Sequence, residues 1–139
     1  MKKVLAVLAA LILLVTLCAC DGDSEDVVFK NGLSTVIHSV YISPSDADEW
    51  TDPLNYARLS AGSSIHIDFA KFAGSGVYYD VAAVDENNRN YDIFEIPLTI
   101  GDKLELSASG GTALLTVTSA DGTVSTYEGY AYDAEEGAG

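Results

Sequence analysis

Downstream of residue 26, apolar and polar residues alternate along the chain with a period of two. Ile65, Ile67 and Phe69, for example, alternate with the polar His66 and Asp68. Successive side chains of a strand point to opposite faces, so this period is typical of strands that bury one face. The pattern predicts eight strands, near residues 27–30, 35–43, 64–69, 77–85, 90–96, 103–108, 112–119 and 123–130.

Turn-forming residues separate these predicted strands. Asp121-Gly122, between the last two, is a strong hairpin signal, because the tight turn of a hairpin needs positive φ at its central residues. Short strands with turns about every 8–12 residues are typical of antiparallel sandwiches and barrels. We therefore predict an all-β fold, an antiparallel Ig-like β-sandwich of seven to eight strands over residues 27–132.

The first twenty residues follow another pattern. Lys2 and Lys3 precede an almost uninterrupted apolar run over residues 4–17, and Ala19 provides a small residue just after it. A charged start, an apolar stretch and a small residue at the cut are the layout of a secretory signal. We predict that residues 1–19 form an N-terminal signal helix that is removed as a signal peptide.

The end of this segment, Leu17-Cys18-Ala19-Cys20, resembles the bacterial lipobox. In that motif a Leu three places before a Cys, with a small residue directly before the Cys, directs lipid transfer onto it. The resemblance implies a bacterial lipoprotein that carries acyl chains such as palmitate on Cys20. Lipidation would attach an otherwise water-soluble domain to a membrane.

Two alternatives to lipidation stay open. Ordinary signal cleavage after Ala19 places Leu17 at the third position before the cut, where a small residue is usual. A permanent membrane helix needs about 20 apolar residues, whereas residues 4–20 supply 17. Both alternatives fit the sequence less well than the lipobox does.

The net charge limits the partners of the mature chain. Without residues 1–19 the chain keeps 120 residues, with five basic and 21 acidic side chains. Nucleic acid and anionic headgroups repel such a surface, so we predict no nucleic-acid partner. Acyl chains can still hold the chain to a membrane, because each buried methylene contributes roughly 0.8 kcal/mol. The predicted location is the bacterial cell membrane, lipid-anchored and facing the extracytoplasmic side, with an envelope protein as the partner.

Both cysteines, Cys18 and Cys20, lie in this leader region. Once Cys20 is lipidated, no thiol remains for disulfides, thiol catalysis or a cysteine metal site. Residues 20–26 are predicted to form a lipidated, acidic tether, because four of the six residues after Cys20 are acidic and none is apolar. Residues 133–139 are predicted to form a disordered tail.

The longest irregular segment, residues 43–62, contains a dense group of acidic residues. These residues are Asp46, Asp48, Glu49 and Asp52. Ca²⁺ takes about six to eight oxygen ligands, and loops commonly supply them. The group is therefore the candidate metal site, and calcium is the one cofactor that the sequence suggests. The alternative is a solvated loop without a cofactor.

Trp50 and Tyr78 are the candidate binding residues. Exposed aromatic side chains provide large, amphipathic contact areas for protein or glycan partners. Packing is the alternative for both residues: Trp50 would plug one end of the sandwich together with Leu54 and Leu59. One of the adjacent Tyr78 and Tyr79 is expected in the core, because neighbours on a strand face opposite ways.

A second recognisable pattern lies between residues 36 and 96. It consists of Tyr41-Ile42-Ser43-Pro44-Ser45, Asp48-Glu49-Trp50, Leu54, Gly62, Ile65, Tyr78-Tyr79-Asp80-Val81 and Asp85. This pattern resembles a small β-sandwich domain of bacterial secreted proteins, a group without an assigned activity. The common pattern has a glycine after the tryptophan, where this chain has Thr51. The resemblance implies the fold and carries no catalytic residues.

Catalytic constellations are not apparent in the sequence. Nucleophilic catalysis needs a Ser or Thr beside a His that a carboxylate orients, and only His38 and His66 are available. We predict that His38 is partly buried and hydrogen-bonded, and that His66 is exposed and paired with Asp68. A glycosidase needs two carboxylates fixed across a cleft, whereas the densest acidic group lies in one loop. We predict that the protein is not an enzyme.

The sequence thus predicts a non-catalytic, membrane-anchored extracytoplasmic lipoprotein that acts as a protein or surface interaction module. The alternative is a small calcium- or ligand-binding β-sandwich module that uses the loop from Asp46 to Asp52.

Overall fold

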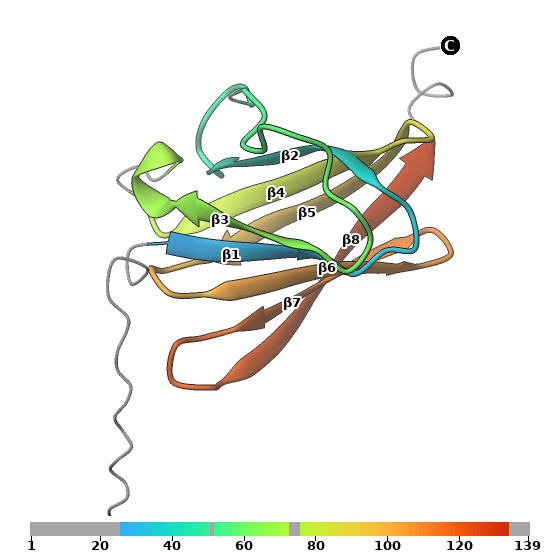
Figure 1. The fold of residues 1–139 in the computed structure, drawn as a ribbon. Coiled ribbons are helices and arrows are strands. Elements are labelled where there is room, and N and C mark those ends of the chain that lie inside the picture. The colour runs from blue at the N-terminus through green and yellow to red at the C-terminus, as the bar shows by residue number, and fades with distance from the viewer. Residues whose placement is uncertain (1–25, 51, 73–75, 134–139) are drawn as a thin grey trace, which may run out of the picture.

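The computed structural model describes residues 26–50, 52–72 and 76–133 (Figure 1). These residues fold into eight strands and one short 3₁₀ turn at Phe69–Lys71, so the fold is all-β. The strands are β1 (Asp26–Asn31), β2 (Ile37–Pro44), β3 (Ser64–Asp68), β4 (Tyr78–Asp85), β5 (Arg89–Pro97), β6 (Lys103–Ser109), β7 (Thr112–Thr118) and β8 (Val124–Asp133). Each predicted strand is confirmed, and the largest difference is that β8 ends three residues later than predicted.

The eight strands form one continuous sheet in the order β2-β4-β5-β8-β7-β6-β1-β3. Every neighbouring pair is antiparallel except β1 and β6, which run parallel. The prediction of a purely antiparallel arrangement is therefore wrong at this pair. Parallel neighbours need a long crossover connection. Here the strands β2 to β5 lie between β1 and β6 in the chain and form this long connection.

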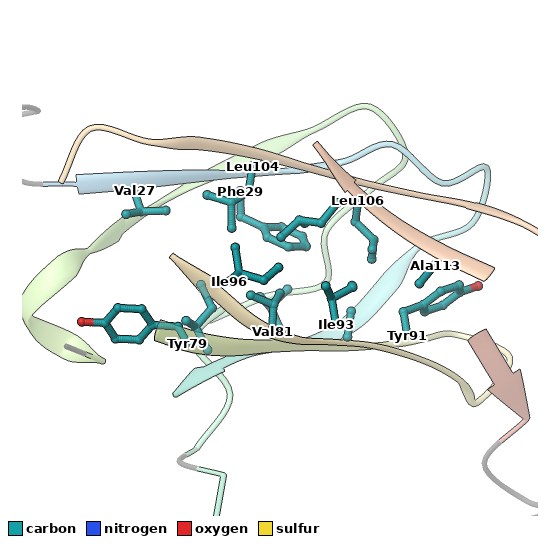
Figure 2. Packing of buried hydrophobic residues seen from close by; sticks show 14 of the residues in the cluster. Val27, Phe29, Tyr79, Val81, Tyr91, Ile93, Ile96, Leu104, Leu106 and Ala113 are labelled. Atoms are coloured by element: carbon teal, nitrogen blue, oxygen red, sulfur yellow. The ribbon is translucent and has the colours of Figure 1, made fainter. Parts of the chain in front are cut away.

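The sheet curls so that two groups of strands face each other across the core. Figure 2 shows side chains of β4 and β5 pointing toward side chains of β1 and β6. Six of these residues, at most 1% exposed, are Phe29, Val81, Ile93, Ile96, Leu104 and Leu106. Burial alternates strictly along β7, as the period of two predicts. Burial of such side chains from both groups holds the curled sheet together.

Strand β8 connects the two groups of strands. Residues 124–130 pair with β7, whereas residues 130–133 pair with β5 (Figure 1). Where β8 crosses to β5, a side chain on Gly129 would fall onto the carbonyl oxygen of Asp92 and lie 2.9 Å from Cα of Ile93. Only glycine allows the two backbones to approach this closely.

The sheet has two edge strands, β2 and β3. The edge of β2 is covered by its own loop, because the Leu54 N–H donates to the carbonyl of Val40 and Leu59 pairs with Ile37. The Asn55 side chain adds two hydrogen bonds between the loop and β2. Its Oδ1 accepts from the Val40 N–H, and its Nδ2 donates to the His38 carbonyl. A covered edge cannot template pairing with another chain.

Several predicted features fall outside the described residues. They are the signal helix of residues 1–19, the lipidated Cys20, the tether up to residue 25 and the tail from residue 134. At the boundaries, Asp26 is the first residue of β1 and Asp133 is the last residue of β8. None of the helical structure in the described ranges is long and apolar enough to cross a membrane.

Candidate functional site

Strand pairing places a row of outward-facing residues across β2, β4, β5 and β8. Tyr41 lies opposite Ala82, Ala82 opposite Asp92, and Asp92 opposite Tyr130. Directly opposite residues of antiparallel strands share a face. Their chain neighbours, such as Val81 and Ile93, point the other way and are buried in the core. The row therefore belongs to the outer face of these four strands.

Aromatic side chains dominate this outer face. We call the following six residues the aromatic face: Tyr41, Trp50, Tyr78, Phe94, Tyr130 and Tyr132. Five of them are substantially exposed, with Tyr130 at 63%, Tyr78 at 54%, Phe94 at 48%, and Trp50 and Tyr132 at 41% each. Folding normally buries such large rings or gives them a partner. Their gathering over four neighbouring strands marks a surface suited to contact.

Trp50 joins this face through a ring contact with β2. Its ring centroid lies 6.1 Å from that of Tyr41, at an interplanar angle of 55°. The tilted arrangement is a favourable aromatic geometry that leaves part of the indole open to solvent. Of the predicted plug residues, Leu59 is buried and Leu54 packs partly against the core, whereas Trp50 stays exposed. The packing alternative therefore holds for the two leucines and not for the tryptophan.

Polar groups lie between the aromatic rings. The Tyr132 hydroxyl donates to Oδ2 of Asp92 at 2.6 Å, and Nδ2 of Asn90 donates to the Tyr132 hydroxyl at 3.3 Å. Partial burial raises the pKa of Asp92, against the lowering effect of the Tyr132 bond. The hydrogen bond to the Asp92 carboxylate raises the pKa of Tyr132 in turn. The pair presents a carboxylate that water solvates only in part.

A bulge in β5 shapes the end of the aromatic face near Tyr78. The pairing of β4 with β5 shifts between Tyr79 and Val81, and Glu95 adopts a positive φ of 58°. Asp80 stabilises this strained position, because its Oδ1 accepts from the Glu95 N–H at 2.9 Å and from the Ser45 hydroxyl at 2.7 Å. Bulges redirect side chains at the edges of functional surfaces.

Next to this bulge lies an open hollow of about 350 Å³. Its lining residues are Ser45, Asp46, Gly76, Val77, Tyr78 and Glu95. The lining combines two carboxylates, Asp46 and Glu95, with the exposed side chains of Val77 and Tyr78. Such a hollow suits a side chain that carries a cation at the end of an apolar stem.

The predicted calcium ligands do not converge in the structure. Asp46 lines the hollow beside Tyr78, whereas Asp52 lines a different hollow with His66 and Asp68. Asp48 and Glu49 are exposed between them. Over the ranges that the structure describes, no three His, Cys, Asp or Glu side chains come together in a way that could hold a metal ion. The geometry therefore does not favour the calcium hypothesis.

The two histidines lie apart: His38 is hydrogen-bonded as predicted, whereas His66 contacts a different partner from the one predicted. His38 is exposed rather than partly buried, because a bulge displaces it beside Ser39, with which its Nδ1 forms a 2.8 Å hydrogen bond. His66 is exposed as predicted, but its Nδ1 lies 3.5 Å from Asp26 on the neighbouring strand β1, rather than beside Asp68. Asp68 instead caps the 3₁₀ turn by accepting from the Ala70 N–H.

Asp85 is buried and serves the structure of the β4–β5 turn. Its carboxylate accepts hydrogen bonds from the N–H groups of Asn87 and Arg89 and from the hydroxyls of Tyr91 and Thr35. Burial on its own raises the pKa of Asp85, but these four bonds outweigh it and lower the pKa. Burial and the bond to Asp85 raise the pKa of Tyr91 to about 12. All polar atoms of this group are occupied internally.

Asp102 is the second buried carboxylate, and it is less well satisfied. Its Oδ2 accepts from the Thr99 N–H at 2.9 Å, whereas Oδ1 has no hydrogen-bond partner among the described residues. Burial raises the pKa of Asp102, and the charge of Asp121 raises it further. Asp102 lies at the start of β6, away from the strands that form the aromatic face.

The sequence candidates Trp50 and Tyr78 both lie on the aromatic face, whereas Phe94, Tyr130 and Tyr132 were not among the predicted binding residues. The spacing of Tyr130 and Tyr132 already places them on one face of a strand. Their position on the same outer face as Tyr41 depends on the strand order, which the period of two does not reveal. Comparison with protein families, with curated proteins and with solved structures finds no match to this chain.

Proposed function

We propose that the chain is a membrane-anchored extracytoplasmic lipoprotein whose β-domain acts, without catalysis, as a protein or surface interaction module. The observation that carries the interaction role is the aromatic face, where five rings are between 41% and 63% exposed. Interfaces are enriched in Tyr, Trp and Phe, which contribute much contact area at a small entropic cost.

The proposal includes a mode of attachment. The lipobox Leu17-Cys18-Ala19-Cys20 would provide the lipid on Cys20, and the strong excess of acidic side chains argues against electrostatic binding to anionic lipid. A tether from Cys20 to Asp26, at about 3.3–3.6 Å per extended residue, would keep the domain within roughly 20 Å of the bilayer. The domain could then reach partners in or near the envelope.

The proposal also assigns the domain to the Ig-like β-sandwiches. The core between β4–β5 and β1–β6 supports this assignment (Figure 2). The parallel pair of β1 and β6, and the continuous hydrogen bonding through β8, are the features in which this domain departs from a purely antiparallel sandwich.

Attachment is tested by comparing the wild-type chain with Cys20→Ser. We expect the wild type to sediment with membranes and to carry a diacylglyceryl mass on its N-terminal peptide. The variant should lose the lipid mass and leave the membrane fraction. An unmodified Cys20 in the wild-type protein, or identical fractionation of the two proteins, would contradict the anchor.

The interaction role is tested by photo-crosslinking in intact cells. The photoreactive amino acid p-benzoylphenylalanine replaces Tyr130 on the aromatic face in one protein, and Glu105 on the outer face of the opposite strands in another. We expect a discrete protein adduct from position 130 and none from position 105. Adducts from neither position, or equally from both, would contradict the assignment of this face.

A further inference from the structure

The charged side chains that point outward from the strands of the aromatic face are all acidic, and Arg89 at the start of β5 is paired with Asp133. The outward residues of β2, β4, β5 and the part of β8 that pairs with β5 are Ser39, Tyr41, Ser43, Tyr78, Asp80, Ala82, Val84, Asn90, Asp92, Phe94, Pro97, Tyr130 and Tyr132. Two of these residues are carboxylates, and none is a lysine or arginine. Glu95 at the bulge and Asp46 in the adjoining hollow add two further carboxylates.

Aromatic rings and carboxylates together form a surface for organic cations. The face of a Trp or Tyr ring attracts a guanidinium or ammonium group. A carboxylate pairs with the same group through charge-assisted hydrogen bonds. In the central row, Asp92 lies directly opposite Tyr130, and Ala82 separates Asp92 from Tyr41. A cation bound there would contact both kinds of group.

Asp92 is well placed to receive such a cation. Its Oδ2 accepts a hydrogen bond from the Tyr132 hydroxyl, whereas the described chain offers no hydrogen bond to its Oδ1. The carboxylate is partly buried, so water compensates its charge incompletely, which is consistent with its raised pKa. A positive group on the open side of Asp92 would provide this compensation.

We propose that the aromatic face binds an arginine- and lysine-rich segment of a protein partner, and this inference rests on the proposed interaction function. Charge complementarity selects this occupant: the mature chain has 21 acidic and five basic side chains, which favours the approach of a basic segment and disfavours nucleic acid or anionic lipid. Arginine binds more tightly than lysine, because its planar guanidinium both stacks on rings and bridges carboxylate oxygens.

The geometry also sets the size of the segment. Tyr41 and Tyr130 are separated by three strand spacings, or roughly 14 Å at about 4.8 Å per strand. An extended peptide of about five residues covers this distance. Its alternate side chains reach the central row, and a further side chain reaches the hollow lined by Asp46, Tyr78 and Glu95.

The test uses the full lipidated chain in nanodiscs of neutral phosphatidylcholine. Trp50, the only tryptophan of the chain, reports binding by its fluorescence. The probes are a hexa-arginine peptide, a hexa-lysine peptide, a hexa-glutamate peptide and a neutral cellohexaose. We expect saturable binding of hexa-arginine, weaker binding of hexa-lysine and no binding of the other two. Raising the salt from about 50 to 500 mM should weaken hexa-arginine binding by about tenfold or more.

Variants assign the binding to the aromatic face. Tyr130→Ala and Asp92→Asn should each weaken hexa-arginine binding by about tenfold while Trp50 remains as reporter. The matched controls are Tyr56→Ala, which alters a 97% exposed tyrosine of the loop, and Glu105→Gln, which alters an exposed carboxylate of β6. Both controls should bind as the wild type does. Equal circular dichroism spectra and melting temperatures confirm that each variant is folded.

Three results would overturn the inference. These are hexa-arginine binding that is no stronger than hexa-glutamate binding, equal losses in the control and the face variants, and preferential binding of cellohexaose. The last result leaves the interaction function intact, because the same face would then bind a neutral glycan. Failure of the interaction function itself would appear separately, in the crosslinking from positions 130 and 105.

Discussion

At the scale of single residues, the two buried carboxylates have opposite roles. Asp85 accepts four hydrogen bonds and fixes the β4–β5 turn. Asp102 is equally buried, but one of its oxygens has no partner in the described chain. Hydrogen bonds to a buried carboxylate stabilise its ionised form, whereas burial without enough such bonds destabilises that form. The two residues should therefore respond differently to mutation and to pH.

We expect Asp85→Ala to lower the free energy of unfolding by about 3 kcal/mol, because it leaves two N–H groups and the Tyr91 hydroxyl without their acceptor. Urea unfolding followed by circular dichroism measures the change. Asp48→Ala, an exposed residue, is the control and should change the stability by less than about 0.5 kcal/mol. A loss at Asp85 as small as that at Asp48 would show that the network contributes little.

The pH dependence of Asp102 has the opposite sign to that of Asp85. Because the folded state raises the pKa of Asp102, its ionisation opposes folding at neutral pH, and protonation relieves this cost as the pH falls. Asp85, with a lowered pKa, instead loses its stabilising contribution in acid. We expect Asp102→Asn to melt higher than the wild type at about pH 7, with a difference that shrinks as the pH falls through the raised pKa. A difference that is constant with pH would contradict this account.

At the scale of the elements, the sequence predicts the strands well and their partners poorly. The period of two and the turn Asp121-Gly122 locate all eight strands, because both are local properties of the chain. The parallel pairing of β1 and β6 depends on contacts between segments far apart in sequence, which no local pattern encodes. The antiparallel prediction fails at this pair for that reason.

The same limit explains how much of the candidate site could be predicted. Trp50 and Tyr78 are candidates from the sequence because exposed aromatic side chains provide large contact areas. Phe94 turns outward next to the bulge at Glu95, and the sequence carries no glycine or proline that marks this bulge. Tyr130 joins the site because β8 pairs with β5 as well as with β7. Neither feature follows from the residues alone.

Gly129 is the residue on which the crossing of β8 onto β5 depends. We expect Gly129→Ala to destabilise the fold by about 3 kcal/mol, because the new methyl group would overlap backbone atoms of Asp92 and Ile93. Gly111→Ala is the matched control, since its methyl would lie 3.8 Å from the nearest carbonyl oxygen, that of Ala131. Thermal melts of both variants measure the effect. Similar melting temperatures for the two variants would refute the close crossing.

The cover over the edge of β2 depends on Asn55. We expect Asn55→Ala to loosen the loop, because the Val40 N–H loses its acceptor and the His38 carbonyl loses its donor. Amide hydrogen exchange should accelerate about tenfold or more at Val40. The N–H of Leu115, in the core strand β7, provides the internal reference and should exchange at its wild-type rate. Unchanged protection of Val40 would mean that the cover does not need Asn55.

At the scale of the whole molecule, the net charge and the proposed anchor would act together. An acidic domain held close to a bilayer by a lipid would stay off the anionic surface, and its aromatic face would then be available to a partner. The face lies on β2, β4, β5 and β8, while the described chain begins at β1 in the facing group of strands (Figure 1). The start of the described chain and the proposed binding face therefore lie on different groups of strands.

The proposed function depends on this one face. The most direct measurement is an amide NMR map of the ¹⁵N-labelled, lipidated chain in nanodiscs, titrated with solubilised envelope proteins of the organism that encodes it. We expect line broadening that concentrates on Tyr41, Asp92, Tyr130 and their neighbours across the four strands. Broadening confined to β1, β6 and β7, or no broadening anywhere, would contradict it.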